Sequence, residues 1–303
     1  MPDPISTVKS SAGRPWYSPI ALLQRLILYA LIAYLTLCVY LFFAQNSLLY
    51  PRVATGAVLP KEKAIKIAHL VGLIPWDRTV PGSDAPQGYI RHDFTQSASR
   101  GTVVVFHGNG DWAWARTDYV AAITQRGFRT FLYEYPGYGG RPGRPSEATI
   151  VPDAQALIRS LDQAGYGPVY VWGESLGAGV AASVCADPAL PVHGLVLLTP
   201  WDNLANVGYS LYPYIPVRWL LVDKYNSIAN LEHFKHPICV IRSTQDEIIP
   251  PTLTLNLFAH LPEPKKMIEQ EGYGHNDWPR SPELPWWDDV LNFIAPERAL
   301  AKK

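Results

Sequence analysis

Residues 168–186 decide the fold, because they read as a strand, PVYVW, a turn, GESLG, and a helix, AGVAASVCA, with nothing between them. The strand is apolar and rich in β-branched and aromatic residues, and the small residues of the last segment suit a closely packed helix. A turn this sharp leaves no room for side chains two residues before and after its centre, where Gly173 and Gly177 stand. It would expose the hydroxyl of Ser175 at the positive end of a helix dipole. The alternative is an ordinary tight turn that contains a serine.

Further apolar runs of strand length lie on both sides of this segment, and helical patterns alternate with them. The predicted strands are Thr102–Phe106, Thr130–Tyr133, Pro168–Trp172, Gly194–Leu198, Pro237–Ile241 and Lys266–Ile268. The predicted helices are Ala113–Gln125, Ser146–Leu161, Ser175–Cys185, Thr252–Ala259 and Trp286–Ile294. Strands that alternate with helices pair in parallel through right-handed crossovers. The predicted fold class is therefore α/β, with a mostly parallel sheet that helices cover on both faces.

The composition excludes several classes of protein. The 303 residues suffice for one large domain or two small ones. The 26 basic and 26 acidic side chains cancel, so no overall field attracts nucleic acid. Cys38, Cys185 and Cys239 provide neither a disulfide framework nor the paired spacing of a zinc site. The Gly-rich turns lack the GxxxxGK[ST] pattern of a phosphate loop, and we expect no nucleotide, other cofactor or metal.

An uncharged run of 19 residues, Leu26–Ala44, stands near the N-terminus. As a helix it would be about 28 Å long, close to the hydrocarbon thickness of a bilayer. We interpret it as an uncleaved single-pass membrane anchor; a cleaved signal peptide and a buried soluble helix are the alternatives. The flanking basic residues are Lys9, Arg14 and Arg25 before the run and Arg52, Lys61 and Lys63 after it. Because Arg25 lies nearest the run, we expect the N-terminus in the cytoplasm and the remaining chain on the non-cytoplasmic side.

The chain then divides into four segments. Residues 1–25 form a tail, residues 26–44 the anchor, residues 45–86 a linker and domain entry, and residues 87–303 the α/β domain. Within that domain, residues 201–236 separate two predicted strands. These 36 residues are too few for a large lid domain, and we expect them to form a small cap of one or two helices.

Ser175 needs a base, and that base needs an orienting carboxylate, before the hydroxyl can act as a nucleophile. In an open parallel sheet, reactive groups gather just beyond the carboxyl ends of the strands. His275 follows the last predicted strand and is the candidate base, and Asp246 follows the preceding strand and is the candidate acid. Glu247, beside Asp246, and Asp202, after the strand that ends at Leu198, remain alternatives for the acid.

A nucleophilic mechanism also requires two N–H groups that stabilise the negative oxygen of the intermediate. The amide of Leu176, the residue after the serine, is one candidate. The strand Thr102–Phe106 leads into the Gly-rich turn HGNG, whose Asn109 amide is the second candidate, with Gly110 as its alternative. In that turn His107 is expected to brace the loop.

Aromatic residues accumulate in two places that suit an apolar substrate. Tyr209, Tyr212 and Trp219 lie in the cap segment, and Trp112 and Trp114 follow the HGNG turn. Such side chains near a reactive serine fit an acyl chain or another apolar ester. The alternative is that they pack the cap against the sheet.

The motifs HGNG, YPGYGG, GESLG, STQDEIIP and GYGHND occur in this order between residues 107 and 277. The chain thereby resembles the α/β-hydrolase superfamily, and within it the membrane-anchored serine hydrolases with a small cap and an N-terminal signal anchor. The resemblance covers roughly residues 20–295. The resemblance implies Ser175 as nucleophile, Asp246 as acid, His275 as base, and the amides of Asn109 and Leu176 as oxyanion hole. One departure is Ser243, where that group commonly has glycine.

The sequence therefore predicts a serine hydrolase that cleaves carboxylic esters or thioesters of apolar or lipid-like substrates through an acyl-enzyme. The same three residues could instead carry out acyl transfer or cleave amides or peptides. A catalytically silent binding module of the same fold is the remaining alternative. The expected partners are a small-molecule ester or lipid and a membrane, and no oligomeric state is predicted.

Overall fold

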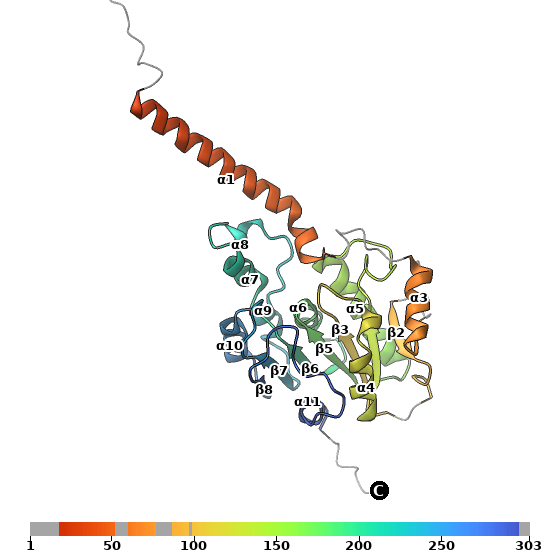
Figure 1. Ribbon diagram of the computed structural model, residues 1–303. Coiled ribbons are helices and arrows are strands. Elements are labelled where there is room, and N and C mark those ends of the chain that lie inside the picture. The colour runs from red at the N-terminus through yellow and green to blue at the C-terminus, as the bar shows by residue number, and fades with distance from the viewer. Residues whose placement is uncertain (1–17, 52–59, 77–86, 97–98, 297–303) are drawn as a thin grey trace, which may run out of the picture. The chain divides into compact units, whose positions relative to one another are not determined.

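The structure is a computed structural model that describes residues 18–51, 60–76, 87–96 and 99–296 (Figure 1). It divides into two compact units, residues 1–44 and residues 45–303. In the first unit, helix α1 begins at Pro19 and continues through Ala44 to its end at Leu49 in the second. Among the described residues, α1 alone is long and apolar enough to cross a membrane, and its most apolar window has mean hydropathy 2.4.

The predicted apolar run 26–44 lies inside α1, which extends beyond it at both ends. Most of the predicted tail, residues 1–17, lies outside the described residues. Lys9, Arg14 and Arg52, on which the predicted orientation partly depends, lie outside them as well.

An eight-stranded sheet forms the centre of the second unit. From edge to edge its strands are β1 (Leu73–Pro75), β2 (Gly88–Arg91), β4 (Arg129–Tyr133), β3 (Thr102–Phe106), β5 (Val169–Glu174), β6 (Val192–Leu198), β7 (Ile238–Ser243) and β8 (Lys265–Gln270). The six predicted strands are confirmed and pair in parallel. Strands β1 and β2 were not predicted, because three or four residues show no recognisable period, and they pair antiparallel at one edge.

The helices of this unit are α3 (Lys61–Leu70), α4 (Thr117–Gln125), α5 (Glu147–Gln163), α6 (Leu176–Val184), α7 (Leu204–Leu211), α8 (Val217–Leu220), α9 (Ser227–Leu231), α10 (Pro251–His260) and α11 (Trp286–Ile294). The prediction of one continuous helix over Ala113–Gln125 was wrong. A 3-10 turn, η1 (Ala113–Ala115), is followed by a break at Arg116 and then by α4. Arg116 has φ −95° and ψ 43°, outside the helical range, and its side chain enters a buried ion pair.

Helices pack on both faces of the sheet (Figure 1). One face packs against α5, α6, α9 and α10, and the other packs against α4 and α11. On the second face Trp172 of β5 meets Tyr119 of α4 and Trp287 of α11 edge-on or tilted, with ring centroids 5.4 and 5.1 Å apart. Burial on both faces explains why the strands are continuously apolar instead of alternating.

The cap lies between β6 and β7 and contains α7, α8 and α9, two of them only four or five residues long. Asn203 and Asn226 cap α7 and α9, each accepting a hydrogen bond from a backbone N–H three residues on. The cap thus begins directly beyond the carboxyl end of β6, the edge of the sheet where the candidate residues were expected.

Candidate active site

Ser175 stands between the last residue of β5 and the first residue of α6. Its φ of 54° and ψ of −115° belong to a region that residues with a side chain rarely adopt. A Cβ atom at Gly173 would overlap the Gly177 carbonyl oxygen, and one at Gly177 would overlap the carbonyl oxygen of Phe106. The two glycines therefore allow the strained turn that presents the hydroxyl.

The structure brings Ser175, His275 and Asp246 together. His275 Nε2 lies 2.9 Å from Ser175 Oγ, and His275 Nδ1 lies 2.8 Å from Asp246 Oδ2. The second Asp246 oxygen accepts hydrogen bonds from the amides of Ile248 and Ile249. Because His275 and Asp246 are both buried, the carboxylate interacts with the ring in a medium of low dielectric constant. The arrangement holds the imidazole with Nε2 directed at the Ser175 hydroxyl.

The two alternative acids make other contacts. Glu247 Oε2 accepts a hydrogen bond from the backbone N–H of His275 at 3.0 Å, and this bond lowers the pKa of Glu247. Asp202 accepts hydrogen bonds from the side-chain amides of Asn206 in the cap and Asn256 in α10. Glu247 thus positions the backbone of His275, whereas Asp202 ties the cap to the sheet domain.

The candidate oxyanion donors lie next to Ser175. Leu176 is the first residue of α6, so its N–H has no carbonyl partner within the helix. The loop that carries Asn109 also approaches the serine: a Cβ at Gly108 would lie 3.7 Å from Ser175 Cβ. Tyr138 fixes this loop by donating a hydrogen bond to the Asn109 carbonyl oxygen. The loop and the helix end can therefore present N–H groups to the same oxygen.

A buried histidine–carboxylate pair braces the same loop. His107 Nε2 lies 3.0 Å from Glu134 Oε1, and the other Glu134 oxygen accepts a hydrogen bond from the Ala113 amide. His107 Nδ1 is 2.8 Å from the Gly108 carbonyl oxygen, and Tyr135 donates to the His107 carbonyl. His107 accordingly holds the loop, as its place in the Gly-rich turn predicted.

A second buried carboxylate, that of Glu174, was missed by the sequence reasoning. Arg116 donates to it from Nε at 2.9 Å and from Nη2 at 3.1 Å, and Tyr119 donates its hydroxyl at 3.1 Å. Arg116 also pairs with Asp111, two residues beyond Asn109. Burial lowers the pKa of Arg116, but Glu174 and the other nearby groups outweigh it and raise the pKa overall. This bridge joins the residue before Ser175 to the loop that carries Asn109.

We expect Arg116→Ala to lower the free energy of unfolding by about 3–5 kcal/mol, because the buried Glu174 loses both hydrogen bonds from Arg116 and keeps only the more distant Arg280, 3.8 Å away, as a cation. Urea denaturation of the full chain in a mild detergent measures the change. Arg159→Ala is the matched control, since Arg159 pairs with Asp187 on the surface and should contribute at most about 1 kcal/mol. Equal losses for the two variants would contradict a structural role of the buried bridge.

The five candidate substrate-binding aromatics separate into two groups. Trp112 and Trp114 stack on each other beyond the oxyanion loop, with centroids 5.1 Å apart and planes 11° apart. Tyr209, Tyr212 and Trp219 of the cap are 58, 41 and 87% exposed. The three cap side chains thus face solvent more than they enclose the serine.

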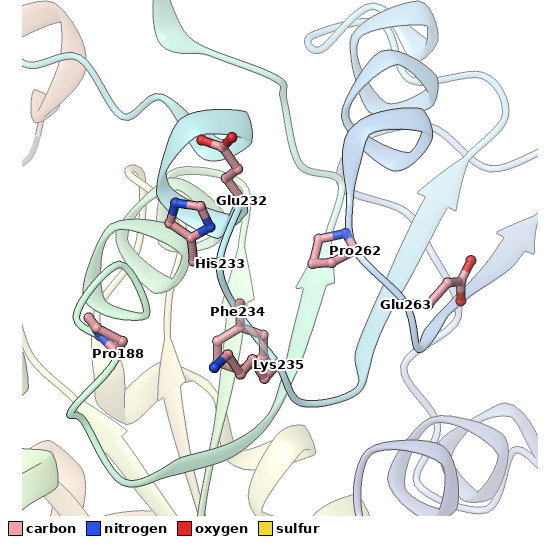
Figure 2. Close-up of a pocket in the computed structure, with 7 residues that line it drawn as sticks. All are labelled: Pro188, Glu232, His233, Phe234, Lys235, Pro262 and Glu263. Atoms are coloured by element: carbon pink, nitrogen blue, oxygen red, sulfur yellow. The ribbon is translucent and has the colours of Figure 1, made fainter.

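One surface pocket lies away from Ser175. It is lined by Pro188, Glu232, His233, Phe234, Lys235, Pro262 and Glu263 (Figure 2). Pro188 precedes β6 and the other residues precede β7 and β8, so the pocket lies at the amino ends of these strands, whereas Ser175 lies at the carboxyl end of β5. Within the described ranges no group of three His, Cys, Asp or Glu side chains is placed to hold a metal ion.

Comparison with known proteins gives matches in both sequence and structure. A family model described as serine aminopeptidase S33 matches residues 97–227. An uncharacterised protein of Mycobacterium tuberculosis is 39% identical over 186 residues, 60% of this chain and 66% of that protein. Lysophosphatidylserine lipase ABHD12 of Danio rerio is 26% identical over 217 residues, 62% of this chain and 57% of the lipase. The chain thus spans less than two thirds of the length of these two relatives.

A crystal structure of an α/β-hydrolase from Vibrio vulnificus superposes on 76% of this chain and 86% of its own. The TM-score is 0.60 at 18% identity, a likeness that establishes the fold. The order of strands around Ser175 and the matched family agree with this assignment. The chain therefore has the α/β-hydrolase fold, as the order of its motifs predicted.

Proposed function

We propose that the protein is a serine hydrolase of carboxylic esters or thioesters, with Ser175 as nucleophile, His275 as base and Asp246 as acid. The observation that carries the proposal is the continuous hydrogen-bonded chain from Ser175 Oγ through the imidazole to the Asp246 carboxylate. A serine hydroxyl is too weakly acidic to attack unaided, and such a chain removes its proton as it attacks.

In the proposed reaction, Ser175 Oγ attacks the carbonyl carbon while His275 Nε2 takes the hydroxyl proton. The amides of Leu176 and Asn109 stabilise the resulting oxyanion, and Asp246 stabilises the imidazolium. His275 then returns the proton to the leaving alcohol or thiol, which leaves an acyl group on Ser175. Water attacks this ester with His275 again as base, and the acid product departs.

The proposed substrates are apolar or lipid-like. One relative bears the name lysophosphatidylserine lipase, and α1 would hold the catalytic unit at a bilayer. We further propose that residues 26–44 are a single-pass membrane anchor and that the catalytic unit lies on the non-cytoplasmic side, because Arg25 borders the run. Trp112 and Trp114 are proposed to contact the apolar part of the substrate at the site, whereas the more exposed Tyr209, Tyr212 and Trp219 would contact it only where it enters.

A fluorophosphonate probe tests the proposed nucleophile. The wild-type chain is expected to bind the probe covalently, and the adduct is expected on the peptide that contains Ser175, as located by mass spectrometry. His275→Ala should slow labelling strongly, because the serine then lacks its base. Labelling that is as fast in Ser175→Ala as in the wild type would reject the assignment.

A panel of substrates distinguishes esterase activity from the alternatives. The family model that matches is named for an aminopeptidase, so each ester is paired with the amide of the same acyl group. We expect the ester of each pair to be cleaved faster. Adding a lipid alcohol as acceptor tests acyl transfer, and a dominant transfer product would replace hydrolysis as the proposed activity.

A further inference from the structure

The cap carries a concentration of exposed apolar side chains. We call this surface the cap patch and define it as Tyr209, Leu211, Tyr212, Trp219 and Val222. The exposed fractions of Leu211 and Val222 are 57 and 64%, similar to those of the aromatic members. Helices α7 and α8, which carry or adjoin all five residues, pack against each other. Soluble proteins tend to expose large apolar residues singly, so a group of them marks an interaction surface.

The chemistry of the cap patch fits a lipid interface. Residues 204–222 contain no acidic side chain, and their one charged residue is Arg218, next to Trp219. Tyrosine and tryptophan combine an apolar ring with a polar tip and collect at the level of lipid headgroups. An arginine beside them can reach lipid phosphate while its stem stays in the apolar layer. Protein interfaces are also rich in tyrosine, tryptophan and arginine, so the choice of lipid depends on the contacts between the cap and Gln45.

The chain also ties this surface to the end of the proposed anchor. Gln45, which directly follows Ala44, belongs to the same compact unit as the cap. Its side chain donates to the Leu220 carbonyl oxygen at 3.1 Å and accepts from the Val222 amide at 2.8 Å. Tyr50 donates its hydroxyl to Asp223 at 2.7 Å. The residues around Val222 are therefore hydrogen-bonded to Gln45, the residue that directly follows the proposed anchor in the chain.

We propose that the cap patch lies in the headgroup layer of the bilayer that holds residues 26–44, and so fixes the orientation of the catalytic unit on the membrane. The proposal rests on the proposed function in one respect, namely that residues 26–44 are a membrane anchor. It adds a second contact with lipid, made by the cap itself. Through this contact, esters within the bilayer reach Ser175 more readily than an anchor alone would allow.

Tryptophan fluorescence tests the contact directly. The full chain is reconstituted in phosphatidylcholine vesicles whose acyl chains carry bromine near the headgroup. Subtracting the emission of Trp219→Phe isolates Trp219 from the other nine of the ten tryptophans. We expect this emission to be quenched by the brominated lipid. Unquenched emission with a solvent-like spectrum overturns the proposal, and so does unquenched, blue-shifted emission, which would indicate that a second copy or another protein covers the patch.

A matched pair of double variants tests the consequence for catalysis. Leu211→Ser/Val222→Ser changes the patch, and Leu70→Ser/Val71→Ser changes exposed residues of the same types at the end of α3, 85 and 45% exposed. We expect the first variant to lose about tenfold in turnover of a fluorogenic monoacylglycerol in the vesicles, because two apolar contacts with lipid are lost. Its turnover of p-nitrophenyl acetate in solution should not change.

The control variant should keep both activities. Equal turnover of the bilayer substrate by the two double variants would reject an orienting role of the patch. Failure of the proposed function would look different: Ser175 would not react with the fluorophosphonate probe, while the quenching of Trp219 would still report the contact with lipid.

Discussion

Replacing Ser175 by alanine is expected to lower kcat for ester hydrolysis by about 10⁶-fold. The side chain lies 2.9 Å from His275 Nε2, and no other hydroxyl makes that contact among the described residues. A residual rate of about 10³–10⁴-fold over the uncatalysed reaction should remain, because the oxyanion donors still bind the transition state. Steady-state kinetics on the most rapidly cleaved ester of the panel measures the change.

Two controls separate a chemical effect from a structural one. Ser160→Ala removes a hydroxyl that only bonds the Leu157 carbonyl on an exposed turn of α5, and it should retain full activity. The double variant Ser175→Ala/His275→Ala should be no slower than Ser175→Ala, since the base has no function without the nucleophile. If the fold-reduction in kcat of the double variant were the product of those of the two single variants, Ser175 and His275 would act independently.

Replacing Asp246 by asparagine is expected to lower kcat by about 10⁴-fold. An uncharged amide cannot stabilise the imidazolium, and its NH₂ group favours the wrong tautomer of His275. The backbone amides of Ile248 and Ile249 should still bond the remaining side-chain oxygen, so the loop keeps its shape. Thermal unfolding of Asp246→Asn should therefore stay close to that of the wild type while the rate falls.

Variants of the two alternative acids, Glu247 and Asp202, are the comparison for Asp246→Asn. Glu247→Gln keeps an oxygen that can accept the hydrogen bond from the His275 backbone N–H, and we expect kcat to fall less than tenfold. Asp202→Asn changes contacts with Asn206 and Asn256 and should affect stability more than rate. If kcat fell by orders of magnitude in Glu247→Gln or Asp202→Asn while Asp246→Asn stayed nearly normal, the substituted residue would be the acid instead of Asp246.

The parts of the fold that could be predicted are those with a long, regular pattern. Strands buried on both faces have continuous apolar runs, so β3, β4, β5, β6 and β7 were visible in the sequence. The edge strand β8, with the sequence KKMIEQ, is mostly half-buried, and only its centre was predicted. Strand β2, with the sequence GYIR, is short and owes its place to its neighbours β1 and β4. The break at Arg116 was also hidden, because it depends on an ion pair with a residue 58 positions away.

The candidate site also contains residues that could be predicted from the sequence and residues that could not. Ser175, His275 and Asp246 each follow a strand, and chain order alone brought them to one edge of the sheet. The bracing residues Glu134 and Glu174 lie at or just beyond strand ends too, but a lone glutamate there has no local signature. Their function is visible only through the partners they meet, His107 and Arg116. The exposure of the cap aromatics likewise could not be predicted. It depends on how the short cap helices are oriented, and the amino-acid composition of the cap does not determine that orientation.

The backbone at Ser175 has one more consequence. A non-glycine residue with φ 54° and ψ −115° carries strain of about 1–3 kcal/mol, which glycine would relieve. Selection for stability alone would therefore favour glycine at position 175. The serine found there indicates that its hydroxyl has a function. Stability and activity oppose each other at this single position. A more heat-resistant form of the protein should therefore be sought in substitutions elsewhere, since replacing Ser175 by glycine would remove the proposed nucleophile.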